Sequence, residues 1–559
     1  MIKIDTSPRR SLLLLLLSSG IAVHGLLMIG STLVEQMDAR LGRHFVHVNS
    51  FALDSSILFG LTLLYLSTLL RRGKRTAWAA ALLIYGVIVA VALYRIGDIT
   101  GAHHPLAVGA RTLLLPLLAV AGLWVLRGHF TVRSDLRSFT FSLRFITLVL
   151  AVAFTYGTAG FVLLDRHDFH QEITVPDAMH RTIDQFDLTT SHNLRPSTRR
   201  ARLFLDSLSV VSMGAVGYAV VSLFQPIRAR LVDGARQRQL AHSLLDRHKG
   251  SSEDFFKLWP HDKLYFFNLS HTAGLAYGVY RGVALVVGDP FGRREAFDSL
   301  LTSFTEFCRT NDWLPAFVHT EPKYMELYKK HDFDLQKIGE EAVLQVPHFV
   351  AHGRTSKYFR QISNKFKRQA CVAELLQPPH NDAVIARLRA ISDDWLKQPG
   401  RAERRFLMGH FTPSYMQQCP VMVLRDAAGT IQAFINQVPS FDPHEANFDL
   451  LRHTHESPGN ANDFLLMQFI EYLHMQGYER VNLGLCPLSG LDGADEERSV
   501  IDSALRFLYA NGDRLYSFSG LRRFKAKYEP EWSGRYIAYR GGIRGFTRVL
   551  NALNKAMKV

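Results

Sequence analysis

Six apolar runs, all within the first 232 residues, set the strongest limit on how this chain can fold. A helix needs about 20 apolar residues to cross a hydrocarbon core about 30 Å thick. The second and fourth runs are short, and no convincing small-residue cleavage site follows the first, which we therefore interpret as a retained helix. The runs cover residues 11–33, 55–70, 77–94, 113–126, 145–164 and 208–224. The sequence predicts an N-terminal all-α transmembrane bundle of about six helices over residues 1–232.

Basic residues between the runs predict its orientation, because short basic loops stay on the cytoplasmic side. With six spans, the arginines before the first run and the basic segments after the second, fourth and sixth all fall on one face, with both chain ends. Residues 165–207 are discordant, since they carry four arginines yet fall outside, but long loops obey the rule weakly. We expect a multi-pass membrane protein whose C-terminal part is cytoplasmic.

The average composition combines two unlike parts. The 559 residues have a mean hydropathy of only +0.01 and a net charge of +15. The four cysteines are far apart and form no CxxC pair, which disfavours a disulfide framework and a zinc knuckle. The chain also lacks GxxxxGK[ST] and a GxGxxG after a strand, so nucleotide-phosphate chemistry of these kinds lacks support, and it has no HExxH motif.

From about residue 233, strand and helix periods alternate. Residues 274–288 predict a hairpin with an Arg281-Gly282 turn, followed by a helix over 295–309 and a strand over 314–318. A similar order recurs from residue 421, with a helix over 463–476 that Asn462 or Asp463 would cap. We expect two similar α/β lobes, residues 233–350 and 351–559, with residues 340–420 bridging them and the catalytic motifs in the second.

The strand segment 448–452 contains the first candidate residues, Asp449 and Arg452. Strand alternation would place Asp449 on one face and Arg452 on the other. A carboxylate at a strand end could orient or deprotonate a hydroxyl. A structural Asp, bonded to a helix N-terminus, is an equal alternative.

Two further segments could bind anions. Residues 482–491 lead from a strand into a Gly/Pro/Ser turn, whose N–H groups could hold an oxyanion or phosphate, although an ordinary strand end is more common. A nucleophilic role for Cys486 is disfavoured, because no partner histidine is visible. Residues 519–528 interleave four cations with aromatic residues, which suits a phosphate-bearing ligand, a nucleic acid or a headgroup better than a solvated basic face. These cations are Arg522, Arg523, Lys525 and Lys527.

Residues 357–368 predict a basic amphipathic helix. Apolar residues recur in it near helical spacing, and such a helix suits a membrane surface or an RNA backbone. An ordinary surface helix is equally compatible. Its cations are Lys357, Arg360, Lys365, Lys367 and Arg368.

Several separated motifs together resemble the phosphatidylglycerol lysyltransferases, also called aminoacyl-phosphatidylglycerol synthases or multiple peptide resistance factors. The similarity covers most of residues 250–540, and Phe448 replaces a usual methionine. The motifs are Gly288-Asp289-Pro290, Gly339-Glu340-Glu341, the run 448–491, the run 516–532 and Arg535-Tyr536-Ile537-Ala538-Tyr539.

The resemblance implies a cytoplasmic tandem of acetyltransferase-like (GNAT-like) lobes on a bacterial inner membrane. It implies transfer of a lysyl or alanyl group from aminoacyl-tRNA to a glycerol hydroxyl of phosphatidylglycerol. The product lowers the negative charge of the membrane and gives resistance to cationic antimicrobial peptides. Large members add a flippase bundle, which six spans would not supply. Whether a separate flippase moves the product, and whether the chain forms a homo-oligomer, stay open.

The resemblance also suggests roles for individual residues. Asp449, Arg452 and Lys525 are the expected catalytic residues, and residues 357–368 would contact tRNA or headgroups. The expected substrate-binding residues are Arg522, Arg523, Lys527, Asn482 and Ser489. The activated ester supplies the driving force, so no cofactor and no metal are expected.

Two alternatives remain. The first is a CoA-dependent acyltransferase acting on a lipid, although a QxxGxG-type pyrophosphate loop is absent after either hairpin. The second is a non-enzymatic transporter or scaffold with a soluble lobe.

Overall fold

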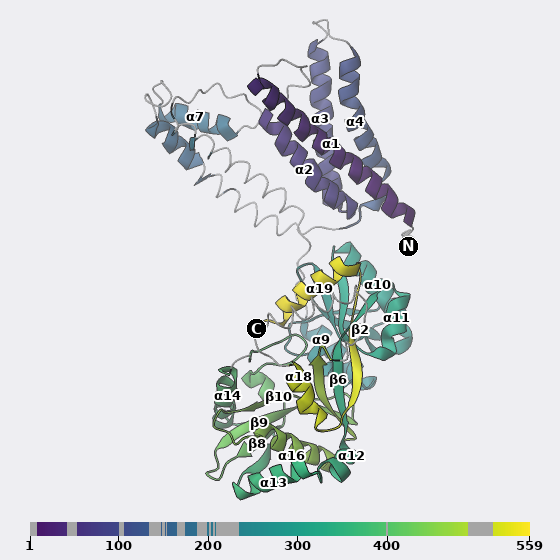
Figure 1. Ribbon diagram of the computed structural model, residues 1–559. Helices are drawn as coiled ribbons and strands as arrows, with labels where there is room; N and C mark the ends of the chain where they lie inside the picture. The colour runs from purple at the N-terminus through teal and green to yellow at the C-terminus, as the bar shows by residue number, and fades with distance from the viewer. Residues whose placement is uncertain are drawn as a thin grey trace. The chain divides into compact units, whose positions relative to one another are not determined.

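The computed structural model divides the chain into two compact units (Figure 1). One comprises residues 1–228 with 310–312, and the other residues 229–309 with 313–559. The structure describes residues 8–41, 53–99, 106–132, 151–152, 154–164, 174–186, 234–398, 401–489 and 518–559, with positions 147, 198, 200, 203–204 and 207.

Apolar helices build the N-terminal unit. Helices α1 and α2 cross closely at Gly25 and Gly60, since a Cβ atom at Gly25 would lie 2.7 Å from the Gly60 carbonyl oxygen. Leu63 and Leu66 of α2 are fully buried in the core formed there. The named helices are α1 (Pro8–Leu41), α2 (Leu53–Arg71), α3 (Arg75–Ile99), α4 (Leu106–Val125) and α7 (Val175–Phe186).

Among the described residues, one segment, Leu12–Gly30 of α1, is long and apolar enough to cross a membrane. The apolar helical segments Gly60–Arg71, Arg75–Ala90 and Leu113–Val125 are shorter than a full span. The fifth predicted run is helical over 154–163, and the sixth, 208–224, lies outside the described residues. The count of six spans therefore stays a prediction. Large apolar side chains nevertheless face outward, among them Leu16, Leu27, Leu61, Leu83 and Leu118.

A single sheet runs through the C-terminal unit, in the order β1-β2-β3-β5-β12-β6-β11-β10-β9-β8-β7, with β4 paired to β2. Strand β12, near the end of the chain, lies antiparallel between β5 and β6. The boundary at residue 350 stays a prediction, but these C-terminal residues, which we assigned to the second lobe, complete the first half of the sheet. The strands are β1 (Leu264–Phe267), β2 (Ala273–Tyr280), β3 (Val283–Val287), β4 (Phe291–Gly292), β5 (Leu314–Thr320), β6 (Asp334–Gln345), β7 (Val372–Leu376), β8 (Val421–Arg425), β9 (Ile431–Val438), β10 (Glu445–His453), β11 (Arg480–Pro487) and β12 (Glu531–Tyr539).

The first half contains the predicted hairpin. Arg281 and Gly282 have φ angles of 49° and 74°, and two positive φ angles suit a tight turn between β2 and β3. The predicted helix over 295–309 is α10 (Phe297–Thr310). Helix α19 (Gly542–Met557) packs Phe546 and Val549 against β3 and β5. Also in this half are α9 (Gly234–Arg247) and α11 (Met325–Lys330), with the 3-10 turns η2 (Asp254–Lys257), η3 (Arg294–Ala296) and η4 (Pro322–Tyr324).

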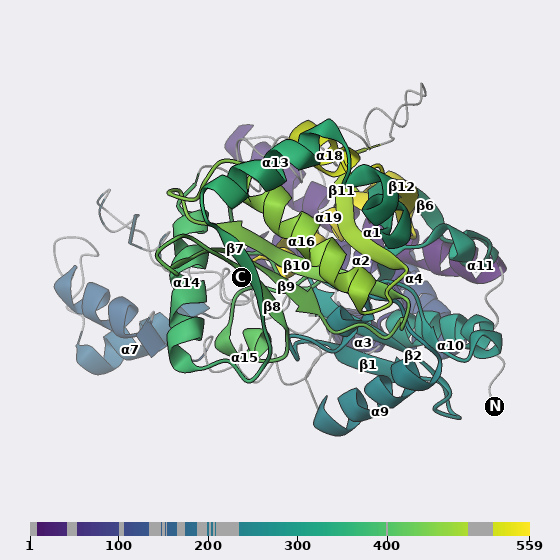
Figure 2. The ribbon, with the colours of Figure 1, turned by 90° about the horizontal axis from the view of Figure 1, so that it is seen from below.

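In the second half, alternating strand residues pack against different helices. Val421 and Val423 of β8 join the core of α14 (Asp382–Leu396), whereas Met422 and Leu424 join that of α16 (Ala461–Met475). Figure 2 shows α16 crossing β8, β9 and β10. The predicted cap of α16 was wrong: the helix begins directly after Asn460, which has a left-handed φ of 72°. Other helices here are α12 (Val346–His348), α13 (Lys357–Arg368), α15 (Pro413–Met416) and α18 (Phe518–Ala526), with a π-turn over Phe349–Gly353.

Candidate functional site

The site forms where two neighbouring strands separate. Strands β10 and β11 pair in parallel only over Glu445–Asn447 and Arg480–Asn482. Beyond this point each is irregular against its other neighbour, β10 between Phe448 and Leu451 and β11 between Asn482 and Leu485. Bulges of this kind bend strands and redirect side chains. A cavity of about 1120 Å³ lies here, walled by residues from both halves of the sheet.

The bulge in β10 changes the predicted direction of Asp449 and Arg452. Simple alternation would send them to opposite faces, but the register shifts between Phe448 and Leu451. Both side chains therefore contact the side of the sheet covered by α14 and α15, where Asp449 accepts from Tyr415 and Arg452 donates to Ser392. The expectation of opposite faces was therefore wrong. The bulge is visible only in the pairing of the folded sheet, not in the sequence.

Asp449 is a half-buried carboxylate in the cavity wall. Its Oδ2 atom accepts a hydrogen bond of 3.0 Å from the Tyr415 hydroxyl. Burial raises its pKa to about 7, against the opposing effects of Tyr415 and of the nearby Arg452 charge. A Cβ atom at Gly409 would lie 2.4 Å from the same oxygen, so this position leaves no space for a side chain. A carboxyl of this kind can exchange a proton near neutral pH.

Arg452 is buried and held from several sides. It forms hydrogen bonds of 2.7 and 2.9 Å with the two carboxylate oxygens of Glu403, and its guanidinium lies 4.8 Å from the ring centre of Trp395. It also donates to the Ser392 hydroxyl. Such bidentate pairs fix orientation as well as charge. Arg452 therefore sets the electrostatics of the wall next to Asp449.

Lys525 is a buried cation on the same cavity. Its Nζ atom donates to the carbonyl oxygens of Gly484 and Leu485 at 2.8 and 3.1 Å, at the bulge of β11. Burial lowers its pKa to about 8. Asn482, also on the wall, accepts 2.7 Å from the backbone N–H of Gly484. The second bulge therefore positions an ammonium group on the lining that also carries the Asp449 carboxylate.

Other predicted binding residues are not among those that line the cavity. Arg522 pairs with Glu340 and stacks 4.3 Å from the ring centre of Trp532. Ser489 accepts from the Glu340 backbone N–H at 3.1 Å. Arg523 is exposed on α18.

Lys527 bonds Asp463 at 3.1 Å and the Tyr358 hydroxyl at 2.8 Å. Of the other motif positions, residues 490–491 and 516–517 lie outside the described residues.

Cys486 is buried, and burial raises the pKa of its thiol, which opposes a nucleophilic role.

Helix α13 matches the predicted amphipathic segment residue for residue. Phe359, Ile362 and Phe366 are buried in the second half of the unit. Its cations are exposed, except for the half-buried Lys365, which donates 2.6 Å to the Gly459 carbonyl oxygen. The helix is therefore anchored by its apolar face and exposes a basic face to the solvent.

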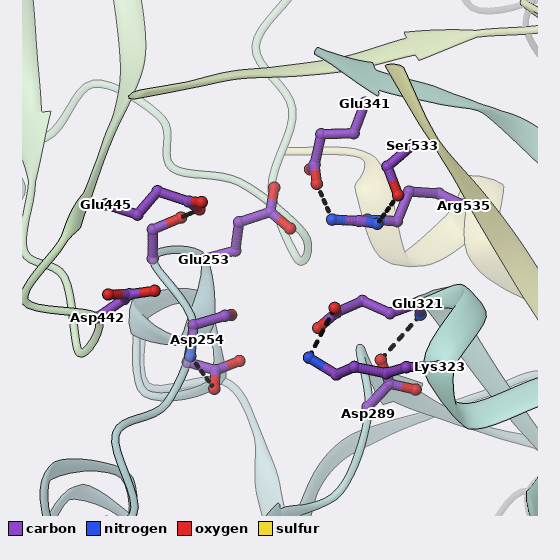
Figure 3. A network of polar contacts seen from close by, with 12 residues as sticks. Glu253, Asp254, Asp289, Glu321, Lys323, Glu341, Asp442, Glu445, Ser533 and Arg535 are labelled. Carbon is purple, nitrogen blue, oxygen red and sulfur yellow. Dashed lines mark hydrogen bonds and ion pairs between the residues drawn. The ribbon is translucent and has the colours of Figure 1, made fainter. Parts of the chain in front are cut away.

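Sequence analysis missed a charged cluster formed by η2, β5, β6 and β12. His319 of β5 lies between two carboxylates, with Nδ1 3.1 Å from Glu253 and Nε2 3.7 Å from Glu341. Arg535 of β12 also pairs with Glu341. Figure 3 shows Glu253 lying between Glu445 and the Glu341–Arg535 pair. Only the Glu340-Glu341 and Arg535 motifs gave any signal for this group.

A second missed group surrounds Asp289, in the Gly288-Asp289-Pro290 motif. Its carboxylate accepts from the Tyr328 hydroxyl at 2.8 Å and from the Glu321 backbone N–H at 2.9 Å (Figure 3 draws the latter). Burial raises the pKa of Asp289 to about 7. Lys257 bonds the Asp289 carbonyl oxygen at 2.7 Å. These contacts join β3, β5 and η2 into one wall of the cavity.

One group of described residues has ligand types that a divalent metal could use. Glu253, His319 and Glu341 each offer an atom within 4.8 Å of the others. However, the Arg535 guanidinium already pairs with Glu341, and its charge opposes a cation there. The cluster is better described as an ion-pair network.

Comparisons with known proteins identify relatives of the C-terminal unit. Residues 242–539 match the family described as "Phosphatidylglycerol lysyltransferase, C-terminal". The phosphatidylglycerol lysyltransferase of Bacillus subtilis (strain 168) is 33% identical over 285 residues, which are 50% of this chain and 32% of that protein. That of Staphylococcus aureus (strain COL) is 30% identical over 302 residues, 54% of this chain and 35% of that protein. The chain thus matches about a third of the length of these relatives.

Two solved structures share the fold of the C-terminal unit. L-PGS from Bacillus licheniformis is 28% identical with a TM-score of 0.51, covering 57% of this chain and 95% of that one. The C-terminal domain of a putative lysylphosphatidylglycerol synthetase from Agrobacterium fabrum is 29% identical with a TM-score of 0.51, covering 58% and 98%. The unit therefore has the GNAT-like acyltransferase fold implied by the motifs. Because the family match spans more than half of its residues, this chain belongs to the phosphatidylglycerol lysyltransferase C-terminal family.

Proposed function

We propose that this chain transfers a lysyl or alanyl group from aminoacyl-tRNA to a glycerol hydroxyl of phosphatidylglycerol. The observation that carries the proposal is the cavity between β10 and β11. Asp449, Arg452 and Lys525 are among the residues that line this cavity, and all three belong to the region that matches the family. The named relatives are phosphatidylglycerol lysyltransferases, which favours an aminoacyl donor and this lipid acceptor.

The reaction is an ester exchange. The lipid hydroxyl oxygen attacks the aminoacyl carbonyl carbon, a new C–O bond forms to the lipid, and the C–O bond to the tRNA ribose breaks. Asp449, with a pKa of about 7, takes the hydroxyl proton and can return it to the departing ribose oxygen. Lys525 stabilises the negative charge that develops on the carbonyl oxygen. Arg452 orients this site through its bonds to Glu403.

Residues beyond the cavity lining would contact the rest of the substrates. We propose that the exposed cations of α13 contact the tRNA backbone or lipid headgroups. Arg522, Arg523 and Lys527, on and just after α18, add positive charge, and Lys527 contacts Tyr358 of α13. Arg522 would reach a phosphate by exchanging its carboxylate partner, Glu340. Asn482 and Ser489 shape the β11 end of the site through backbone hydrogen bonds.

The N-terminal unit is proposed to be a multi-pass bundle of about six helices in the bacterial inner membrane, with the catalytic unit cytoplasmic. The long apolar segment of α1 and the outward-facing leucines of α1–α4 support this location. The basic segments between the apolar runs support the orientation. A bilayer location keeps the enzyme beside its lipid substrate.

The test mixes the full-length chain in phosphatidylglycerol vesicles with tRNA charged with labelled lysine or, separately, alanine. Label should move into the chloroform-extractable lipid, and mass spectrometry of that lipid should show the added amino acid. RNase pretreatment should abolish the transfer. Label that persists after RNase, or that comes only from a CoA thioester, would exclude tRNA as the donor. Absence of any covalent lipid product would favour the transporter or scaffold.

A further inference from the structure

His319 has a backbone conformation that a strand residue with a side chain rarely adopts. It lies in β5 with a φ of 73°, and the pairing with β12 shifts register beside it, between Tyr536 and Ile537. Left-handed conformations outside glycine persist where the surroundings impose them, and they concentrate at functional sites. At this irregularity the imidazole reaches the cavity wall.

The imidazole has a carboxylate on each side. Nδ1 lies 3.1 Å from Glu253 Oε2, and Nε2 faces Glu341 Oε1 at 3.7 Å. Glu341 is fully buried, and its Oε1 atom has no hydrogen-bond partner among the described residues, while Oε2 accepts from Arg535. A neutral ring offers one N–H and would turn a lone pair toward the other carboxylate. The ring therefore contacts Glu253 at hydrogen-bond distance and lies against the unpartnered buried oxygen of Glu341.

Glu253 connects this bridge to the catalytic lysine. Its side chain is 27% exposed and lines the cavity, unlike the sealed Glu341. Lys525 lines the same cavity as Glu253. Burial disfavours its ammonium form, whereas the neighbouring Cys486 and the negative charge of Glu253 favour it. Although burial opposes the change, the pKa of Glu253 is itself lowered by the charges of His319, Arg535 and Lys257, which keep the carboxylate ionised.

We propose that His319 is a positioning residue for the reaction: set between Glu253 and Glu341, it holds the Glu253 carboxylate on the cavity wall, where its negative charge supports the Lys525 ammonium. This role rests on the proposed function, because it assigns Lys525 to the developing oxyanion. In this proposal His319 positions the Glu253 carboxylate, and the charge of that carboxylate stabilises the Lys525 ammonium.

A divalent cation on the same three residues is the competing interpretation. Arg535 already pairs with Glu341, so a divalent ion here would add positive charge beside that guanidinium. The ion-pair network is therefore the better fit, and chelation provides a direct check.

The experiment measures kcat and KM of the full-length chain in phosphatidylglycerol vesicles across pH 6–10, with charged tRNA as donor. The variants are His319→Gln, Glu253→Gln and the double variant. His331→Gln is the matched control, since His331 also contacts a carboxylate, Asp298 at 3.0 Å, but does not line the cavity. Thermal unfolding of each variant reports whether it folds.

We expect His319→Gln and Glu253→Gln each to move the alkaline loss of kcat to lower pH. A displacement of one pH unit lowers the rate above pH 8 about tenfold, with smaller losses at pH 7 and little change in either KM. The double variant should be no slower than the slower single variant, because both act through one carboxylate. His331→Gln should retain the wild-type profile.

Three results would overturn the inference: a His319→Gln profile equal to that of His331→Gln, additive losses in the double variant, or wild-type activity that EDTA removes and Zn²⁺ restores. If His319→Gln does not fold, an unchanged alkaline limb in Glu253→Gln overturns it instead. A wild type that forms no aminoacyl lipid refutes the proposed function, and this role with it. An active wild type with an unaffected His319→Gln refutes this role alone.

Discussion

Asp449 illustrates how a buried carboxyl group in a candidate site can reduce stability. Its pKa is about 7 in the fold against an ordinary 3.8, so folding takes up a proton between these values and stability falls as pH rises through them. This pKa difference lowers the free energy of unfolding at pH 8 by at most about 4 kcal/mol. Asp449→Asn should therefore raise the thermal midpoint at pH 8 and leave it nearly unchanged below pH 4, while turnover falls about a hundredfold or more.

A suitable control is Asp426→Asn. The pKa of Asp426 is lowered, mainly by its bond to Gln432, and it lies on an exposed turn. Its removal should not raise the midpoint and should leave turnover unchanged. Calorimetry and lipid-labelling assays on the same preparations measure both effects. A less stable Asp449→Asn at pH 8 would contradict the burial argument.

The pH profile of the wild type should be bell-shaped. Asp449 accepts a proton only when ionised, so turnover should fall below about pH 7, and Lys525 supplies charge only when protonated, so it should fall above about pH 8. In Lys525→Arg the guanidinium stays charged, and the alkaline loss should move up by more than one pH unit even if the maximal rate falls. An unchanged alkaline limb would show that another group causes it.

Sequence reasoning located part of this site, for identifiable reasons. Asp449, Arg452 and Lys525 lie in dense polar motifs, and all three line the cavity. His319 was missed because it directly follows the predicted apolar strand 314–318 and carries no motif of its own. Only the fold brings it to Glu253, 66 positions earlier in the sequence. A sequence motif shows polar residues that are close together in the sequence, whereas the residues of this cluster come from separate segments and meet only in the folded chain.

At the scale of elements, the strongest periodicities were the most reliable. Helix α13 begins and ends at the predicted residues because its apolar positions follow helical spacing without a break. The start of α16 was predicted too late. The helix begins directly after Asn460, whose left-handed conformation cannot be inferred from the sequence. The bulges in β10 and β11 were equally invisible, although they decide which side chains reach the cavity.

Helix α13 supports a prediction about nucleic-acid binding. Replacing Lys357, Arg360 and Lys367 with Glu should raise KM for charged tRNA, with kcat little changed. It should also reduce the slope of binding against log salt by up to about three, one for each phosphate that the helix no longer neutralises. Filter binding at several salt concentrations measures this slope. The control reverses Lys329 and Lys330, exposed lysines on α11. Equal slopes in both variants would exclude α13 as the tRNA-binding element.

For the whole C-terminal unit, the sequence predicted two α/β halves but not how the chain closes them. Strand β12 returns from the end of the chain to lie between β5 and β6, and α19 then covers the first half. Pairing between strands so distant in sequence leaves no local pattern. This closure nevertheless matters for the site, because it brings Arg535 of β12 to Glu341 of β6.

For the whole chain, the proposed bilayer anchor should raise the effective concentration of phosphatidylglycerol at the cavity and should not change the rate of the transfer step. Residues 234–559 contain the complete described cavity lining, and the Agrobacterium fabrum structure is likewise a C-terminal domain, so we expect this part to fold alone. On detergent-dispersed lipid, the fragment should match the kcat of the full-length chain. On vesicles, its apparent KM for phosphatidylglycerol should rise about a hundredfold, because tethering supplies effective concentration. Equal KM values on vesicles would show that the catalytic unit binds the bilayer by itself, and a lower kcat in detergent would show that the helices contribute to the chemistry.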